Sequence, residues 1–222
     1  MPELTLIIAN RNYSSWSLRA WLALAATGAD FDEVLVALGQ PETAAGILRW
    51  SPSGRVPALR DGELTIWDSL AICEYLAERF PDAGLWPSDP QLRAIARSVV
   101  SEMHSGYTAV RGNMPMNIRA SYPGAGRGPG VDEDVQRITT VWETCRREFG
   151  LDGDLLFGNF TIADAFFAPI VSRFRTYGVE VAGVAAEYME AVWALPTMRD
   201  WVEKAHAEVM RVDRYDMNSD QS

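Results

Sequence analysis

The sequence predicts an α/β domain followed by an all-α domain, and three observations support this division. Strand and helix patterns alternate over residues 1–80, prolines cluster over residues 81–90, and strand patterns are absent from residues 91–222. Alternating apolar residues are typical of strands, whereas apolar residues three or four apart are typical of helices. At 222 residues the chain exceeds the usual domain size of roughly 100–150 residues, so two domains fit its length.

The first 80 residues carry the signals of a small mixed sheet with helices around it. We expect strands over residues 4–9, 33–38, 56–59 and 64–67, and helices over residues 15–27, 42–50 and 69–80. Gly28 ends the first of these helices, and Asp61-Gly62 is a hairpin signal between the last two strands. The resulting order, βαβ, a short helix and then ββα, predicts an α/β domain.

The remainder of the chain is helical in pattern. Residues 81–90, P-D-A-G-L-W-P-S-D-P, form a linker by composition, and apolar residues at helical spacing then predict one long helix from Leu92 to Val110. We expect further helices over residues 132–149, 161–175, 181–194 and 197–209, and a frayed polar tail at the end of the chain. The Gly/Pro-rich segment Tyr122–Gly130 lacks the phosphate-loop pattern, and we interpret it as a flexible connection able to cover a pocket.

Composition bounds the classes of function. The net charge is −10 and the only lysine is Lys204, which argues against binding to nucleic acid or to an anionic membrane. Two cysteines, Cys73 and Cys145, and two histidines offer neither a disulfide framework nor a zinc site, so we expect no metal. No apolar run approaches the ~20 residues of a membrane span, and the N-terminus lacks a secretory signal. We therefore expect a soluble, cytoplasmic protein in which any anionic ligand meets local arginines.

The segment Asn10–Arg19, N-R-N-Y-S-S-W-S-L-R, lies between a predicted strand and a predicted helix. Serine hydroxyls at such a turn accept hydrogen bonds from the first N–H groups of the helix, so capping is the simplest role for Ser14 or Ser15. The same helix end favours negative charge, because its N–H groups and macrodipole are positive. A serine here is therefore a candidate both for a helix cap and for a catalytic group that stabilises an anion.

Val56-Pro57 places a proline just inside a short predicted strand, although proline cannot donate to a ladder. About one X–Pro bond in twenty is cis in folded proteins. A cis bond here would turn the chain sharply and leave the backbone N–H and C=O of Val56 free for an extended, peptide-like ligand. Only the neighbouring motifs favour that interpretation over a trans proline.

Asp68-Ser69 stands immediately before the predicted helix over residues 69–80. An ordinary cap, in which the aspartate accepts from first-turn N–H groups, explains the pair. A second interpretation uses the same geometry: the hydroxyl and N–H of Ser69 seat a carboxylate, and Asp68 receives an ammonium group. A ligand with a carboxylate and an amine on one carbon suits this pair.

His104, Tyr107 and Arg111 fall at i, i+3 and i+7 of the predicted long helix, so they share one flank. They are candidates for the border of an electrophile pocket between the domains, with Arg111 supplying charge to an acidic substrate. A partly buried flank with satisfied polar groups explains them equally well.

Thr161-Ile162-Ala163-Asp164 begins a helix with a capping-box arrangement, which we interpret as a folding device. The order and spacing of the motifs resemble the glutathione transferase superfamily. These motifs are the serine-bearing turn, Val56-Pro57, Asp68-Ser69, the Pro-rich linker, the helical region and this capping box. The resemblance extends from Leu4 to about Val209. The stretch N-Y-S-S-W-S-L-R-A-W-L-A-L is similar to serine-type bacterial members and, more distantly, to the zeta class.

The resemblance implies a thioredoxin-like, glutathione-binding domain over residues 1–80, a linker over residues 81–90, and an all-helical domain over residues 91–222 that completes the electrophile pocket. It also implies a homodimer with glutathione as co-substrate. Val56, ahead of a cis Pro57, would pair with the cysteinyl backbone, and Asp68 and Ser69 would hold the γ-glutamyl end. Gln40 is one candidate for the glycyl end, to which the sequence assigns no single residue.

The activity implied is a glutathione S-transferase of detoxification type, in which a serine hydroxyl favours the thiolate for attack on small apolar electrophiles. Ser14 is the first candidate for this donor and Ser15 is the second. Whichever serine serves the sulfur, the other one caps the helix. A glutathione-dependent isomerase or peroxidase, and a non-catalytic binding protein of this fold, are the alternatives.

The turn departs from the zeta class, whose proteins resembling maleylacetoacetate isomerase carry Ser-Ser-Cys-Ser-Trp. When Ser15-Trp16 is matched to the end of that run, Asn12, Tyr13 and Ser14 stand opposite its first three residues. The cysteine is absent, which argues against isomerase activity. Since no cysteine precedes Cys73, the disulfide chemistry of cysteine-type relatives lacks its nucleophile.

Overall fold

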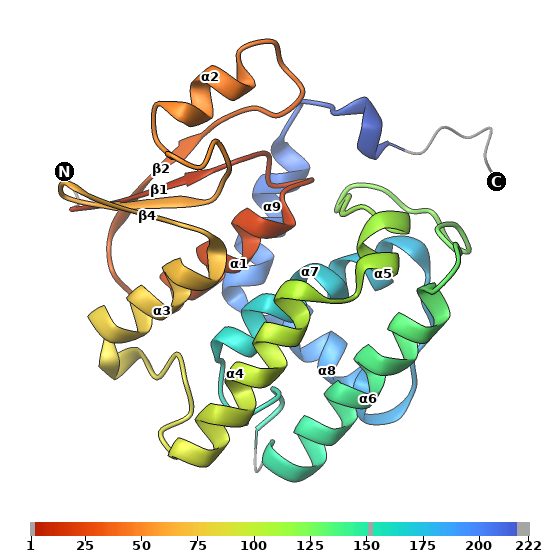
Figure 1. Ribbon diagram of the computed structural model, residues 1–222. Helices are drawn as coiled ribbons and strands as arrows, with labels where there is room; N and C mark the ends of the chain where they lie inside the picture. The colour runs from red at the N-terminus through yellow and green to blue at the C-terminus, as the bar shows by residue number, and fades with distance from the viewer. Residues whose placement is uncertain (1–2, 151–152, 217–222) are drawn as a thin grey trace.

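A computed structural model describes residues 3–150 and 153–216 of the chain. The N-terminal part contains a mixed sheet in the order β2-β1-β3-β4, formed by β1 Leu4–Ile8, β2 Phe31–Leu35, β3 Ala58–Asp61 and β4 Leu64–Trp67. β2 is parallel to β1, with Leu4 opposite Phe31, and β3 is antiparallel to both β1 and β4. β1 therefore lies inside the sheet, in agreement with its apolar sequence (Figure 1).

Helices cover both faces of this sheet. α1 (Ser15–Ala26) and α3 (Ser69–Arg79) lie on one side of it and α2 (Thr43–Leu48) lies on the other (Figure 1). α1 is buried along most of its length because it packs against α3 and also against α7 of the helical part. The helix that follows the serine-bearing turn is thus held between the two parts of the protein.

The rest of the chain is helical and confirms the predicted fold class. It contains η1 Pro81–Ala83, α4 Pro90–Ser105, α5 Thr108–Asn113, α6 Val131–Phe149, α7 Ile162–Tyr177, α8 Gly183–Ala194, α9 Pro196–Ala207 and η2 Asp213–Tyr215. α7 is the central helix, since nearly all of its residues are buried and it packs against α1, α4 and α8. It begins with the predicted capping box, in which Thr161 and Asp164 exchange hydrogen bonds.

The prediction of one long helix through Val110 is wrong. α4 ends at Ser105, because the backbone of Gly106 is extended and that of Tyr107 is left-handed, with φ 54°. A Cβ on residue 106 would lie 2.7 Å from the carbonyl oxygen of Glu102, so this close turn requires glycine. His104 therefore lies on α4 and Arg111 on α5, and the expected shared flank with Tyr107 does not exist.

Three element boundaries also differ from prediction. β2 begins at Phe31 and ends at Leu35, and beyond it the N–H of Leu38 donates to the Asn10 side chain instead of to a strand. β3 begins at Ala58, which leaves Val56 and Pro57 outside the sheet. In the tail expected to fray, residues 213–215 form η2, while residues 217–222 lie outside the described residues.

Candidate functional site

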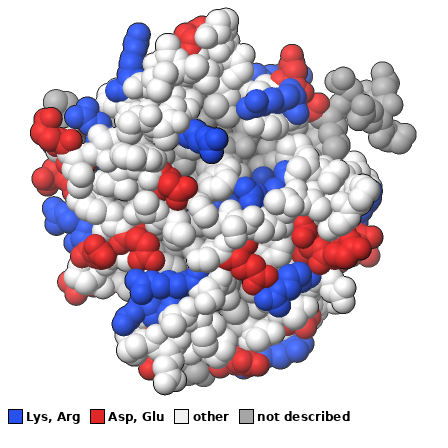
Figure 2. All heavy atoms as spheres, in the orientation of Figure 1, with Lys and Arg blue, Asp and Glu red and all other residues white. Residues whose placement is uncertain are grey.

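A cavity of about 990 Å³ opens between the sheet and the helical part. Its walls come from the turn before α1, the segment around Pro57, the start of α3, the helices α5 and α7, and η2. Of the predicted site residues, it brings together Ser14, Ser15, Val56, Pro57, Asp68, Ser69 and Arg111. Figure 2 shows basic atoms inside a hollow near the centre of this face.

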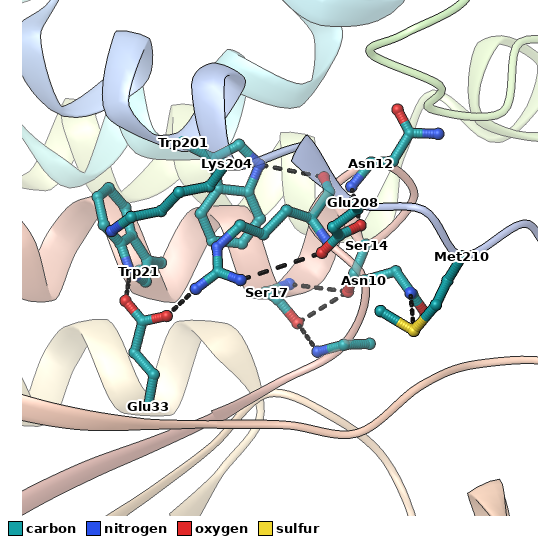
Figure 3. Close-up of polar contacts among 12 residues, drawn as sticks. Asn10, Asn12, Ser14, Ser17, Trp21, Glu33, Trp201, Lys204, Glu208 and Met210 are labelled. Carbon is teal, nitrogen blue, oxygen red and sulfur yellow. Dashed lines mark hydrogen bonds and ion pairs between the residues drawn. The ribbon is translucent and has the colours of Figure 1, made fainter. Parts of the chain in front are cut away.

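Ser14 is the N-cap of α1 and is almost completely buried at the cavity wall. Its hydroxyl oxygen accepts a hydrogen bond from the backbone N–H of Ser17 at 3.3 Å, and its hydroxyl donates to the Ser17 hydroxyl oxygen at 2.8 Å (Figure 3). The Ser17 oxygen also accepts from the N–H of Ala9 at 3.1 Å. Ser14 is therefore a cap and a cavity-lining hydroxyl at the same time.

Ser15 is the first residue of α1 and contacts the helical part through its hydroxyl. Nη2 of Arg173, from α7, lies 3.4 Å from the Ser15 oxygen. The same guanidinium donates to the backbone carbonyls of Met114 and Pro169. The two adjacent serines therefore have different partners: Ser14 belongs to the α1 cap, and Ser15 faces a buried arginine.

The Val56–Pro57 peptide bond is cis. Val56 lies before β3, and none of the hydrogen bonds among the described residues uses its backbone N–H or C=O. Val56 lines the cavity, and an extended ligand there would need its unpaired backbone groups.

Asp68 and Ser69 lie where β4 turns into α3. Asp68 has φ 74° and caps α3 by accepting from the N–H of Leu70 at 2.8 Å, and it is the only acidic residue that lines the cavity in the described structure. The Ser69 hydroxyl is fully buried and has no hydrogen-bond partner among the described residues. A buried polar group without a partner costs free energy unless a ligand supplies the missing hydrogen bond.

His104 lies behind Asp68 rather than in the cavity wall. Its Nε2 is 3.5 Å from a carboxylate oxygen of Asp68, and its ring packs edge-on against Trp16. Burial lowers the pKa of His104 below its usual value. The charges of Arg19 and Arg111 also lower this pKa, whereas the charge of Asp68 raises it. The imidazole is therefore neutral at neutral pH, and it does not act as a cationic partner of Asp68.

Two buried arginines that the sequence interpretation missed lie beside the site. Arg19 is almost fully buried, with its guanidinium 4.5 Å from the ring centroid of Trp16 and 4.8 Å from that of Phe166. Burial lowers its pKa to about 9, and Arg111 and Arg173 contribute in the same direction. Burial likewise lowers the pKa of Arg173 to about 10. In the sequence, both arginines lie within apolar stretches of α1 and α7, and this position could have indicated that they are buried.

The segment after α9 also belongs to the site, which the sequence interpretation missed. Glu208 accepts the backbone N–H groups of Arg11 and Asn12 at 2.7 and 3.2 Å, and Met210 lies against Asn10 (Figure 3). The Arg119 guanidinium donates to the backbone carbonyls of Glu208 and Met210. These contacts fasten the segment to the turn that carries Ser14.

Other predicted site residues lie away from the cavity. Gln40 is exposed, and its backbone N–H donates to Thr43. Tyr107 is buried beside Phe167, and its hydroxyl donates to Glu102. The Tyr122–Gly130 loop contacts the C-terminal end of α7 and does not line the cavity. The described residues contain no cluster of His, Cys, Asp and Glu suited to a metal ion.

Fold and cavity together define the glutathione transferase architecture, a thioredoxin-like domain followed by a helical domain. The family model for the glutathione S-transferase N-terminal domain matches residues 13–79, and that for the C-terminal domain matches residues 128–205. Glutathione S-transferase Z2 of Arabidopsis thaliana is 36% identical over 199 residues, which cover 85% of this chain and 86% of that protein. The chain belongs to the glutathione S-transferase family.

Two further comparisons extend this result. Maleylacetoacetate isomerase of Rattus norvegicus is 39% identical over 99 residues, 43% of this chain and 45% of that protein. The crystal structure of a glutathione transferase homolog from Burkholderia with bound glutathione has a TM-score of 0.68 at 24% identity, covering 92% of this chain and 98% of that one. This second likeness concerns the fold.

In the described part of the chain, no helix has the length and apolar character needed to cross a membrane.

Proposed function

We propose that the protein is a glutathione transferase in which the Ser14 hydroxyl stabilises the thiolate of glutathione for attack on a small electrophile. The position of Ser14 carries this proposal: its hydroxyl caps α1 on the wall of the cavity that also contains Val56 and Asp68. The N-terminus of a helix favours an anion, and the thiolate is the nucleophilic form of a thiol.

The energy required is within the range of one hydrogen bond. A free thiol has a pKa of about 8.5, and lowering it by one unit corresponds to about 1.4 kcal/mol. A hydrogen bond to a charged group contributes about 1.5–3 kcal/mol, so one serine donor accounts for a pKa lower by about one or two units. The thiolate fraction at neutral pH then rises from a few per cent to a large part of the bound glutathione.

The Ser14–Ser17 pair favours Ser14 over Ser15 as the donor. Hydroxyl hydrogens rotate, so Ser17 is able to donate to Ser14 while the Ser14 hydroxyl turns to the sulfur. The Ser14 oxygen then accepts from both the N–H and the hydroxyl of Ser17, which strengthens its own donation. Ser15 is the alternative donor, because its oxygen faces Arg173 and its hydroxyl hydrogen is able to point into the cavity.

Glutathione binding is favoured by the complementary groups around the sulfur site. Asp68 suits the ammonium group, and the Ser69 hydroxyl at the start of α3, which has no partner in the described structure, suits the adjacent carboxylate. The free backbone of Val56 suits the cysteinyl unit between them and Ser14.

Matched substitutions of the two serines test the assignment. In Ser14→Ala we expect kcat/KM with a chlorodinitrobenzene-type electrophile to fall by at least tenfold, and the pKa of enzyme-bound glutathione thiol, measured by thiolate absorbance, to rise. Ser15→Ala should keep most of the kcat/KM and should leave the pKa of the bound thiol nearly unchanged. Glutathione affinity, measured by calorimetry, should change little in either variant. The reverse pattern would transfer the role to Ser15, and full activity in both variants would exclude serine activation.

A glutathione-dependent isomerase acting on an acidic substrate is the second candidate. Arg111 lines the cavity from the helical part, and its two backbone hydrogen bonds use only Nη1, so the rest of its guanidinium suits a substrate carboxylate. The similarity to maleylacetoacetate isomerase over part of the chain supports the same candidate. Product analysis separates it from conjugation, because isomerisation returns free glutathione. Arg111→Gln should then raise KM for an acidic substrate and leave KM for a neutral electrophile unchanged.

We also propose that the protein forms a homodimer. Leu64, the first residue of β4, is a large apolar side chain that is 51% exposed, and we assign it to the contact between the two subunits. Sedimentation velocity should give twice the mass of the chain, and Leu64→Glu should shift the population towards the monomer.

A further inference from the structure

The charges that line the cavity are unequal in number. The basic residues are Arg55, Arg111, Arg173 and Arg214, and the acidic one in the described structure is Asp68. Glutathione carries one ammonium group and two carboxylates, and each carboxylate favours a cationic or N–H partner. Any pairing of these charges rests on the proposed function, in which glutathione binds in this cavity.

The positions of Asp68 and Ser14 orient the tripeptide. Its ammonium group meets Asp68, the one acidic residue in the described cavity wall, at the start of α3, and its sulfur meets the N-terminus of α1. Val56 lines the same cavity, and its backbone has no hydrogen-bond partner in the part of the chain that the structure describes. The glycyl carboxylate, which is at the other end of the molecule, therefore lies on the far side of the sulfur from Asp68.

Two of the four arginines are already bound to backbone carbonyls. Nη1 of Arg111 donates to the carbonyls of His104 and Gly106 at the end of α4. Arg173 donates to the carbonyls of Met114 and Pro169 as well as to Ser15. Both belong to the helical part, so Arg55 and Arg214 remain for the glycyl carboxylate.

Arg214 is held in place by a stack of aromatic rings. Its guanidinium lies 4.5 Å from the ring centroid of Tyr215, and the Tyr215 ring stacks on that of Tyr13 at 5.6 Å. Tyr13 in turn donates its hydroxyl to Asp216, which also accepts from Asn117. A guanidinium stacked on an aromatic face keeps its edge N–H groups available for a carboxylate.

The segment also lies beside the part of the cavity opposite α3. Val212 is buried against Gly39, since a Cβ on that glycine would lie 3.3 Å from Val212 Cγ1, and the adjacent Leu38 lines the cavity. Arg55 is exposed, and only its backbone N–H makes a hydrogen bond among the described residues. Its side chain would have to be ordered on binding, whereas that of Arg214 is already stacked.

We infer that Arg214 binds the glycyl carboxylate of glutathione, so that the segment after α9 completes the glutathione site. Gln40, the candidate from sequence, precedes α2 and is exposed outside the cavity wall. In this arrangement Tyr13 and Tyr215 are positioning residues, because their stacked rings hold the guanidinium.

Three ligands and one matched control variant test the inference. Calorimetry compares glutathione with its glycyl ethyl ester and with γ-glutamylcysteine ethyl ester, neither of which has a free carboxylate at this end. Arg214→Ala should weaken glutathione binding by about two- to fivefold, as expected for an exposed ion pair, and leave binding of the other two unchanged. Arg211→Ala removes an exposed arginine of the same segment that does not line the cavity, and it should change none of the three affinities.

Two results would overturn the inference. Equal weakening of all three ligands by Arg214→Ala would show that the residue only shapes the segment. Loss of the preference for glutathione in Arg55→Ala, with Arg214→Ala unchanged, would assign the carboxylate to Arg55. Absence of glutathione binding by the wild-type protein is a separate outcome, because it would contradict the proposed function as well.

Discussion

The hydroxyl oxygen of Ser14 lies 2.8 Å from that of Ser17, one turn further along α1. Ser17 is completely buried and its oxygen accepts the N–H of Ala9, at the end of β1. The candidate catalytic serine is therefore connected through one hydroxyl to the backbone of the central strand. This connection, two other features of the site and the buried carboxyl group of Asp164 lead to measurable expectations.

Ser17→Ala should affect both stability and the bound thiol. The buried N–H of Ala9 loses its acceptor, so we expect the free energy of unfolding in urea to fall by about 1–3 kcal/mol. The pKa of bound glutathione thiol should rise as well, because Ser14 loses a donor. Ser98→Ala, an exposed serine of α4, is the control and should change neither quantity. An unchanged thiol pKa in Ser17→Ala would restrict Ser17 to a structural role.

Glu208→Ala should loosen the segment that carries Arg214. The backbone N–H groups of Arg11 and Asn12 lose their acceptor, so we expect the free energy of unfolding to fall by about 1–3 kcal/mol. Limited proteolysis followed by mass spectrometry should cut the segment after α9 faster than in the wild type. Glu203→Ala, an exposed glutamate of α9, should behave as the wild type, and equal cleavage rates in the two variants would contradict the assigned contacts.

Asp164 should make stability depend on pH. Burial raises its pKa from 3.8 to about 6, although the N–H groups of Leu156 and Thr161 oppose the rise. Between these two pKa values the native state keeps a proton that the unfolded chain has lost. The resulting stabilisation of the native state is complete below pH ~4 and disappears as the pH rises through about 6.

The variant Asp164→Asn does not titrate and isolates this effect. The free energy of unfolding of the wild type, relative to the variant, should fall by about 2–3 kcal/mol between pH 4 and pH 7. Other carboxylates cancel in the difference. A difference that stays constant over this range would contradict the raised pKa of Asp164.

His104 should make glutathione binding weaker in acid. Its pKa is lowered by burial, so the ring is neutral at pH 7 and gains a proton only below its usual range. The imidazolium would then compete with the glutathione ammonium group for Asp68, 3.5 Å away. KM for glutathione should therefore rise on acidification, and less steeply in His104→Asn. The exposed His206, changed to Asn, is the control, and identical profiles for all three proteins would exclude His104.

The fold class was predictable because it depends on local signals. The apolar run of β1, the hairpin at Asp61-Gly62 and the capping box of Thr161 each act within a few residues of sequence. The break after α4 was not predictable from periodicity, because Gly106 fits a close approach to Glu102 that only the folded helix creates. The apolar pattern continues across this break, so the pattern did not indicate that α4 ends there and that α5 begins in a new direction.

The candidate site divides in the same way. The sequence by itself placed Ser14, Val56, Asp68 and Ser69 in motifs whose local backbone geometry suits an anion or a peptide-like ligand, and all four line one cavity. Among the cations, Arg111 was a candidate from the sequence, whereas only the tertiary structure placed Arg173 and Arg214 in the cavity wall. Arg173 and Arg214 are 159 and 200 residues from Ser14 along the chain, by difference of their residue numbers, and side-chain packing over such separations leaves no local pattern.

Packing also decided which serine has which partner. Ser14 and Ser15 are equivalent in sequence as caps, but α1 turns one towards Ser17 and the other towards Arg173 on α7. That difference exists because α1 is held between the sheet and the helical part, where the direction of each side chain is set by long-range contacts. Residue type and turn chemistry thus specified the serine-bearing end of α1 as a candidate anion site, and the contact between α1 and α7 gave its two serines different partners.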